Sequence, residues 1–546
     1  MRPRRAINRL RLGPVVGHTD ETTSKIWIQV RDDPADYELR VAGAGVFAFA
    51  RTEKNGVLEF RTGLAQATGL RPDWRYTYSI ARRGRRVPGA KGTFRTMPGA
   101  GSMAPIVFCA ISCNTLDTEG QWPALAKYLR DGQPSFLLLM GDQVYIDEDQ
   151  PRVFTFPNKM DRADRRGAIA EKYRLSWSRE VVREVLANIP TYMVWDDHDN
   201  RDGWGSVASD SPTLVARHPR GAAMFADVTG HFEDCRDAYW HFQACRNPTA
   251  DDPVLHFPNY IAAPPAPGQR QAMPFAFRCG RVAVVVIESR GERDVFRKDF
   301  PILGERQWQF IDEVFTTLAE DIDALAVVTP TPIASMDPDG AVQKLKGQRT
   351  DDVEAFKRGN EKGVLSPPSS EDFDQLVLAS IGRRLTDFSG VPVNLGIFKL
   401  SNIDEARDQW SHHISRPEQA ALLKKANLSR FINRPPGAPR ELIFLAGDVH
   451  IGCIHDITFS KPGYNATALT SSGISAKSDS RAVLGIYVDE DFNVADGIHS
   501  KLRDAVADFN FGVVEVLPSP DGAIIHAALV HRGSALTYGA DVSDLV

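Results

Sequence analysis

Cysteine is scarce in this sequence, with six residues among 546, and no two of them are spaced as Cys-x-x-Cys. So few cysteines in so long a chain do not predict a disulfide framework. An excess of positive charge is also missing, because the formal net charge is -5. Proteins that hold nucleic acid through their overall charge are basic, so no stable nucleic-acid partner is predicted.

Long apolar runs are absent as well. No stretch of the sequence approaches the roughly 18 apolar residues that a membrane span requires. The N-terminal residues MRPRRAINRLRLG are basic, but no apolar stretch follows them, so they predict neither a secretory signal nor an anchor. We therefore expect no transmembrane segment. We expect a cytoplasmic location, or an exported or periplasmic one if a leader was removed.

The N-terminal part of the chain reads as β structure only. The stretch TTSKIWIQV alternates, with Ile26, Ile28 and Val30 on one face of a strand and Trp27 and Gln29 on the other. Further short runs of this kind follow, separated by Gly, Pro and Asp. Several short strands with turn signals and no helical period predict a small β-sandwich, and its closing strands resemble those of a fibronectin type III domain.

A chain of this length predicts more than one structural unit. The stretch MPGAGSMAP is rich in Gly and Pro and marks a boundary. We therefore predict a first domain at 1–97, a linker at 98–104 and a second domain at 105–546. Residues 338–400 are charged and only patchily apolar, so we interpret them as an insertion or lid within the second domain.

After Pro105, near-continuous apolar strands alternate with helical segments. Two helices are predicted within 122–132 and 166–189. Continuous apolar strands indicate burial on both faces, and the alternation predicts an α/β sheet covered by helices on both faces. Six such strands are indicated by the runs APIVFCAISC, SFLLLMGD, TYMVWDDHD, VAVVVIESR, ALAVVTPT and ELIFLAGDVH.

Five of these strands end in residue types that carry chemistry. The carboxyl ends of strands in an open α/β sheet are where ligands bind. So many carboxylates at one edge would repel one another, and divalent or trivalent cations remove that repulsion, so a metal site is predicted. The residues are Cys113 and Asn114; Asp142 and Tyr145; Asp196, Asp197, His198 and Asp199; Glu288 and Arg290; and Asp448 and His450.

Each of these features also has an ordinary structural interpretation. A Gly-Asp pair after a strand is usually a turn, and DDHDNRD can be a solvated acidic loop. Cys113 alone is more often a small buried residue, and His450 alone can be a hydrogen-bonded core histidine. The metal site is favoured by the joint pattern, because independent turns would not all fall at strand ends.

The motifs GDxxY, WDDHD and GDVH, in this order behind a β-sandwich, resemble those of the alkaline phosphatase D (PhoD-like) family of the metallophosphoesterase superfamily. The stretches GPVVGHTDETTSKIWIQV and RDQWSHH extend the resemblance over most of the chain. It implies a four-layer αββα core with an N-terminal fibronectin- or Ig-like sandwich. The second domain would then be the catalytic one, and 338–400 is not covered by the resemblance.

The resemblance also implies roles for individual residues. Cys113 and Tyr145 resemble ligands of an iron ion, Fe3+, because thiolate and phenolate both suit it. Asp142 would bridge two metals, and further oxygen ligands favour calcium, as one or two Ca2+, with other divalent metals possible. The implied metal ligands are Cys113, Asp142, Tyr145, Asp197, Asp448 and His450. His198 would lie beside the phosphate and assist the leaving oxygen, and Arg290 is our candidate for holding the phosphate by bidentate hydrogen bonds.

The function implied is that of a metal-dependent phosphodiesterase or alkaline phosphatase. Such an enzyme hydrolyses phosphodiesters, phosphomonoesters or both through a metal-activated hydroxide. Its substrate would be a small phosphate ester or an extended phosphodiester. A non-catalytic metal- or carbohydrate-binding protein on the same fold is the alternative. An amidohydrolase is less favoured, because neither an early His-x-His strand nor a rhythm of eight βα units is found.

Overall fold

The computed structural model of the chain describes residues 10–52, 60–147, 160–206, 210–215, 222–249, 270–295, 297–337, 408–412, 414–476, 488–519 and 522–532. The insertion predicted at 338–400 lies outside these residues. In the described part of the chain, no helix is long and apolar enough to cross a membrane.

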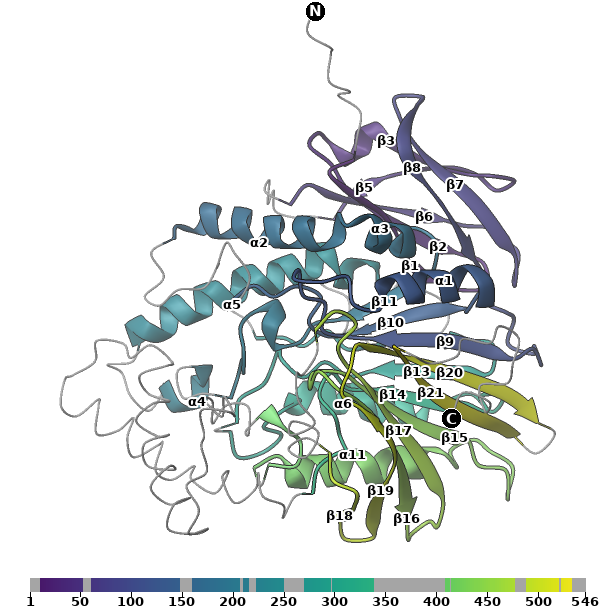
Figure 1. The fold of residues 1–546 in the computed structure, drawn as a ribbon, viewed down its shortest axis with the longest axis vertical. Coiled ribbons are helices and arrows are strands. Elements are labelled where there is room, and N and C mark those ends of the chain that lie inside the picture. The colour runs from purple at the N-terminus through teal and green to yellow at the C-terminus, as the bar shows by residue number, and fades with distance from the viewer. Residues whose placement is uncertain are drawn as a thin grey trace, which may run out of the picture.

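The N-terminal region is the predicted β-sandwich (Figure 1). One four-stranded sheet has the order β1-β2-β6-β5 and the other the order β4-β3-β7-β8. Alternate side chains of both sheets meet between them in a core of their own, which includes Ile26, Leu39 and Ile80. The elements are β1 (Leu12–Thr19), β2 (Ser24–Gln29), the short 3-10 helix η1 (Pro34–Asp36), β3 (Tyr37–Val41), β4 (Gly45–Ala48), β5 (Ala50–Arg51), β6 (Thr62–Ala67), β7 (Arg75–Arg82) and β8 (Arg85–Arg95).

Strand β2 is buried on both of its faces. Ile26 and Ile28 belong to the core of the sandwich, whereas Trp27 belongs to the core of the α/β region. The Trp27 indole donates a hydrogen bond of 2.8 Å to the carbonyl of His241. Alternate side chains of β2 therefore enter two different hydrophobic cores. The sheet that contains β1 and β2 is packed against the α/β region.

The α/β region contains two sheets instead of the single sheet that the strand pattern predicted. A five-stranded sheet has the order β11-β10-β9-β20-β21, and an eight-stranded sheet has the order β12-β13-β14-β15-β17-β16-β19-β18. Figure 1 shows helices α1, α2, α3 and α5 on the side of the first sheet, and α6 and α11 on the side of the second. This is the four-layer αββα core that the family resemblance implied.

The six apolar runs form six strands, which are shorter than the runs because each polar ending lies beyond its strand. They are β9 (Ile106–Ile111), β10 (Phe136–Met140), β11 (Thr191–Val194), β13 (Val282–Val286), β14 (Ala324–Val328) and β15 (Glu441–Ala446). The remaining strands are β12 (Phe275–Cys279), β16 (Gly452–Phe459), β17 (Asn465–Ser471), β18 (Asp491–Ala495), β19 (Ile498–Val506), β20 (Asn510–Ser519) and β21 (Gly522–His531).

The helix predicted within 122–132 is present, and the one predicted within 166–189 is divided in two. The first part ends where the backbone N–H of Ser178 donates to the carbonyl of Arg174. The helices are α1 (Trp122–Gly132), α2 (Arg162–Trp177), α3 (Glu180–Leu186), α4 (Pro212–Val215), α5 (Ala222–Phe242), α6 (Gly304–Thr316) and α11 (Arg416–Ser429). Two 3-10 turns are η2 (Asp197–Asp199) and η5 (Ala244–Arg246).

Aromatic side chains join the two sheets. Tyr192 of β11 stacks on Phe277 of β12 with ring centroids 3.6 Å apart, and Phe136 of β10 meets the same ring edge-on at 5.1 Å. Because β9, β10 and β11 are parallel, their carboxyl ends lie at one edge. Strands β13, β14 and β15 are also mutually parallel. The fold thus brings the polar strand endings of both sheets together.

Candidate metal centre

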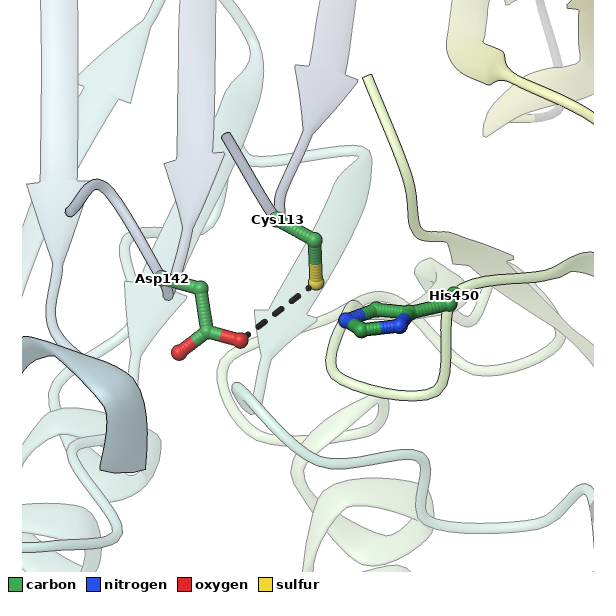
Figure 2. A group of neighbouring side chains, drawn as sticks. All are labelled: Cys113, Asp142 and His450. Carbon is green, nitrogen blue, oxygen red and sulfur yellow. Dashed lines mark hydrogen bonds between the residues drawn. The ribbon is translucent and has the colours of Figure 1, made fainter. Parts of the chain in front are cut away.

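The residues predicted as metal ligands converge at the carboxyl ends of the strands. Cys113 follows β9, Asp142 follows β10, Asp197 follows β11, and both Asp448 and His450 follow β15. Figure 2 shows the side chains of Cys113, Asp142 and His450 pointing toward one another just beyond the strands. Chain segments separated by more than 300 positions thus supply one site.

Three overlapping groups of ligand atoms could each hold a metal ion. In each group, the atoms lie within 4.8 Å of one another. Asp142 and Asp197 each belong to two of the groups, so the groups form a chain of adjacent positions. They are Cys113, Asp142 and His450; Asp142, Asp197 and His198; and Asp196, Asp197 and Asp448.

The softer donors gather on one side of Asp142. The Cys113 thiol lies 3.5 Å from the Asp142 carboxylate, and the Tyr145 hydroxyl lies 3.4 Å from the same oxygen. The Tyr145 hydroxyl is also 2.9 Å from Nε2 of His450. Asp197 and Asp448 lie on the other side with Asp196, so that side offers only oxygen. The three groups therefore run from a mixed S, N and O position at one end to a position of carboxylates alone at the other.

The backbone at this edge adopts a conformation that L-residues rarely tolerate. Four predicted ligands have positive φ angles, at 58° for Cys113, 54° for Asp142, 74° for Asp448 and 56° for His450. Left-handed residues other than glycine cost free energy and cluster at functional sites. The sharp turns after β9, β10 and β15 aim these side chains back across the edge of the sheet, which a continuing strand would not do.

Burial makes the site unfavourable for the charged forms of its own ligands. Burial raises the pKa of the Cys113 thiol and that of the Asp142 carboxyl well above their ordinary values, and each is raised further by a neighbouring aspartate. Burial lowers the pKa of His450 to about 4, so its ring stays neutral at pH 7. Oδ2 of Asp196 and Oδ1 of Asp197 are buried and accept no hydrogen bond from the described residues. Bound cations would satisfy these oxygens and stabilise the carboxylates, so the residues fit the predicted metals.

His198 lies at the border of the site and is held by an aspartate that the sequence analysis did not single out. Its Nδ1 is 3.0 Å from the carboxylate of Asp147, which also accepts the backbone N–H of Asp202 at 2.7 Å. The ring stacks on Tyr145 with centroids 4.3 Å apart. Burial lowers the pKa of His198, but Asp147 and Asp197 outweigh it and hold the pKa well above its ordinary value. Asp147 therefore orients the ring and fixes which nitrogen faces the site.

Arg290 is placed differently from our expectation. The side chain is fully buried, and its guanidinium donates to Asp196 through Nε and to both oxygens of Asp408. The same group lies 3.6 Å from Asp197. Because these donors are directed at carboxylates, the placement opposes direct phosphate binding and makes Arg290 a support for the ligands of the carboxylate side.

Asp408 is a second residue that the sequence analysis did not single out. It joins Arg290 to Arg293, whose guanidinium lies 3.1 Å away, and accepts the Ser206 hydroxyl at 3.0 Å. The adjacent Gln409 donates to the carboxylate of Asp448 at 3.2 Å. The stretch RDQWSHH was the available signal, because it belongs to the family resemblance although no role was assigned to it.

Three other polar strand endings lie near the site and form hydrogen bonds with the backbone and with neighbouring side chains instead. Asp199 accepts the backbone N–H groups of Gln143 and Asp196, and Glu288 accepts that of Gly291 at 2.7 Å. Asn114 donates to the carbonyl of Gln143 and to the hydroxyl of Ser176. These residues stabilise the loops that carry the ligands.

Comparison with known proteins indicates the function of the residues at this edge of the sheet. A family model described as PhoD-like phosphatase matches residues 108–507. The chain belongs to the PhoD-like phosphatase family. A second model, for a domain of unknown function (DUF7800), matches residues 7–97. No curated protein matches the chain.

Two solved structures are similar to this PhoD-like phosphatase. The structure of PhoD is 12% identical, with a TM-score of 0.56, and the match covers 97% of this chain and 92% of that one. The purple acid phosphatase PPD1 from seeds of yellow lupin (Lupinus luteus) is 10% identical, with a TM-score of 0.47, and the match covers 94% and 71%. Family membership and the metal-binding groups identify the chain as a metal-dependent phosphoesterase.

Asp147→Asn should lower kcat by about 10- to 100-fold, the usual cost of losing a partner that orients a site histidine. Metal content and KM should change little, because Asp147 belongs to none of the three ligand groups. Steady-state kinetics and metal analysis of the same preparation test this. Equal losses of metal and activity would contradict a purely orienting role.

Proposed function

We propose that this protein hydrolyses phosphate diesters at least as well as monoesters, with an iron ion and one or two calcium ions as its metals. The observation that carries the proposal is the convergence of Cys113, Tyr145 and His450 on one side of Asp142 and of carboxylates on the other.

The donor types support this choice of metals. Thiolate from Cys113 and phenolate from Tyr145 suit Fe3+, and the carboxylates of Asp197 and Asp448 suit a hard cation such as Ca2+. Asp142 lies between the two sides and would contact both ions. When bound, such metals activate water and neutralise charge on the phosphoryl group.

The protein's own residues supply positioning and proton transfer. His198 stands beside the carboxylate groups with its ring fixed by Asp147 and by stacking on Tyr145. From this position it protonates the leaving oxygen or donates a hydrogen bond to it. Burial raises the pKa of Asp197, but Arg290 and His198 outweigh it and hold the pKa at about 2, so this carboxylate stays ionised. Arg290 also donates to Asp196 and holds it in place, while burial raises the pKa of that carboxyl to about 7.

The charge balance of the site favours diesters. A dianionic monoester gains most from several cationic side chains around its terminal oxygens. Arg290 and Arg293 both bond Asp408, so their charge is directed at a carboxylate of the protein. A monoanionic diester requires less compensating charge, so this arrangement suits it better.

Purified protein should contain iron and show a visible absorption band, because a phenolate bound to Fe3+ gives a charge-transfer transition. Tyr145→Phe should remove the band while the protein stays folded. Metal analysis, the visible spectrum and circular dichroism test this. A colourless, fully active protein that contains only zinc would contradict the iron assignment and leave the phosphoesterase assignment standing.

Bis-p-nitrophenyl phosphate should be hydrolysed with a kcat/KM equal to or above that of p-nitrophenyl phosphate when calcium is supplied. Parallel assays of both esters with one preparation decide this. A strong monoester preference would make the protein a phosphatase in the narrow sense. No hydrolysis of either ester by metal-loaded protein would favour the alternative, a non-catalytic metal- or carbohydrate-binding protein.

A further inference from the structure

A groove runs between the sandwich and the α/β region, away from the metal centre. One part of it is a cavity of about 250 Å³ between β7 and β8 on one side and α1 and α3 on the other. Thr93 and Asn188 continue it into an open depression over the outer face of β3, β7 and β8. Arg95 and Gln133 continue it in the other direction, toward the start of β9.

The groove is rich in positive charge, although the whole chain is acidic. Its carboxylates are Glu184 and Asp73, and each is paired with one of the groove arginines, Arg130 and Arg95 respectively. Arg40 is paired with Glu38 at 3.0 Å, whereas no ion pair links Arg75, Arg86 or Lys91 to any residue in the described ranges. The cations of the groove are Arg40, Arg75, Arg86, Lys91, Arg95 and Arg130.

Strand register orders these side chains into rows. Lys91 lies opposite Ser79, Thr93 opposite Thr77, and Arg95 opposite Arg75. The cross-strand pair of hydroxyls, Thr77 and Thr93, therefore lies between two cross-strand pairs that each contain at least one cation. Lys91 and Arg95 are four residues apart on one strand, or about 13 Å at the usual rise.

The groove is built on a fixed junction. The Tyr78 hydroxyl donates to the carbonyl of Ala187 at 2.8 Å, and the side chain of Asn188 accepts the backbone N–H of Thr93 at 3.0 Å. A Cβ on Gly92 would approach the carbonyl of Ala187 to 1.9 Å, so glycine permits this contact. Because sandwich and core are already joined here, the groove is formed before a ligand binds.

The groove lies at the opposite end of the five-stranded sheet from the metal centre. Its lining includes Pro134, just before β10, and Pro190, just before β11. Asp142 and Asp197 follow the carboxyl ends of these strands. One strand length of about 15 Å or more therefore separates the two sites, and a ligand in the groove does not occupy the metal centre.

We propose that this groove binds an acidic polysaccharide and anchors the enzyme to it. The charged groups of such a polymer are separated by sugar hydroxyls, which matches cation rows separated by a hydroxyl row. Single-stranded nucleic acid would need exposed aromatic rings for stacking, but the lining aromatics Phe94 and Tyr78 are 1% and 4% exposed. Inorganic polyphosphate carries charge at every unit and has no hydroxyl groups that would pair with the hydroxyl row.

Binding of fluorescently labelled polygalacturonate oligomers to the full chain tests the proposal. The Arg75→Glu/Lys91→Glu variant should raise Kd by about tenfold or more, and wild-type binding should weaken as salt increases. The matched control is Lys501→Glu/Arg503→Glu, which reverses two exposed cations on β19 at the far end of the molecule (Figure 1). This control should bind like wild type.

A neutral dextran oligomer that binds as well as polygalacturonate would overturn the proposal, as would tighter binding of poly(dT) or linear polyphosphate. Equal Kd values for wild type and the groove variant would also overturn it. The inference does not rest on the proposed function, because hydrolysis of bis-p-nitrophenyl phosphate should be unchanged in the groove variant. Binding of polygalacturonate by a protein that hydrolyses no phosphate ester would contradict the proposed function and still support the proposed groove ligand.

Discussion

Asp142→Ala is expected to remove both metal binding and phosphoester hydrolysis. Asp142 belongs to two of the three ligand groups, and its carboxylate lies within 3.5 Å of the Cys113 thiol and the Tyr145 hydroxyl. A carboxylate between two ions serves both, so no other ligand can replace it. Metal ions contribute several kcal/mol of transition-state stabilisation, and losing it corresponds to a fall in kcat/KM of about 10³–10⁴-fold.

The measurement is metal content and kcat/KM on the same preparation, with circular dichroism to establish folding. Asp131→Ala is the matched control, because Asp131 is an exposed aspartate paired with Lys127 on α1. The control should keep metal and activity. Full metal content in Asp142→Ala would show that this carboxylate is not a ligand. The metal centre would then have to lie at other residues.

His198→Ala should keep the metals and lose rate. The ring forms a hydrogen bond with Asp147 and stacks on Tyr145, which fixes its orientation as expected for a group that acts on the leaving oxygen. General acid catalysis contributes about 10²–10⁴-fold, so kcat should fall by that factor with a smaller change in KM. Substrates with better leaving groups should lose less, because they depend less on proton donation.

His198 also belongs to one of the groups that could hold a metal, together with Asp142 and Asp197. Metal analysis of His198→Ala therefore distinguishes two roles. Retained metal with a leaving-group-dependent loss of rate supports the acid. An emptied site would make His198 a ligand, and a loss of rate that is equal for all leaving groups would contradict its role as the acid.

The sequence was informative wherever one physical signal dominated. Continuous apolar runs predicted β9, β10 and β15, because a strand buried on both faces excludes polar residues. The polar endings of these runs predicted that their side chains meet at one edge, because parallel strands end there, and the structure brings them together. The division into two sheets was not visible in the strand pattern, since burial on both faces is the same whether a helix or a second sheet covers the strand.

The sequence pattern did not indicate the roles of Asp147, Asp408 and Arg290. Asp147 lies in an acidic loop, and such loops are usually solvated, so its partner His198 could be found only from the fold. Arg290 was our candidate for holding the phosphate by bidentate hydrogen bonds. The structure instead surrounds it with carboxylates, one of which, Asp408, lies 118 positions farther along the chain.

Removal and return of metal test the central claim most directly. The chain should lose hydrolysis of bis-p-nitrophenyl phosphate when its metals are stripped by a chelator and regain it in proportion to the metal bound on titration with iron and calcium. Asp142→Ala should regain nothing under the same titration. Full activity of the metal-free protein, or equal recovery in wild type and Asp142→Ala, would contradict a metal-dependent phosphoesterase centred on this edge of the sheet.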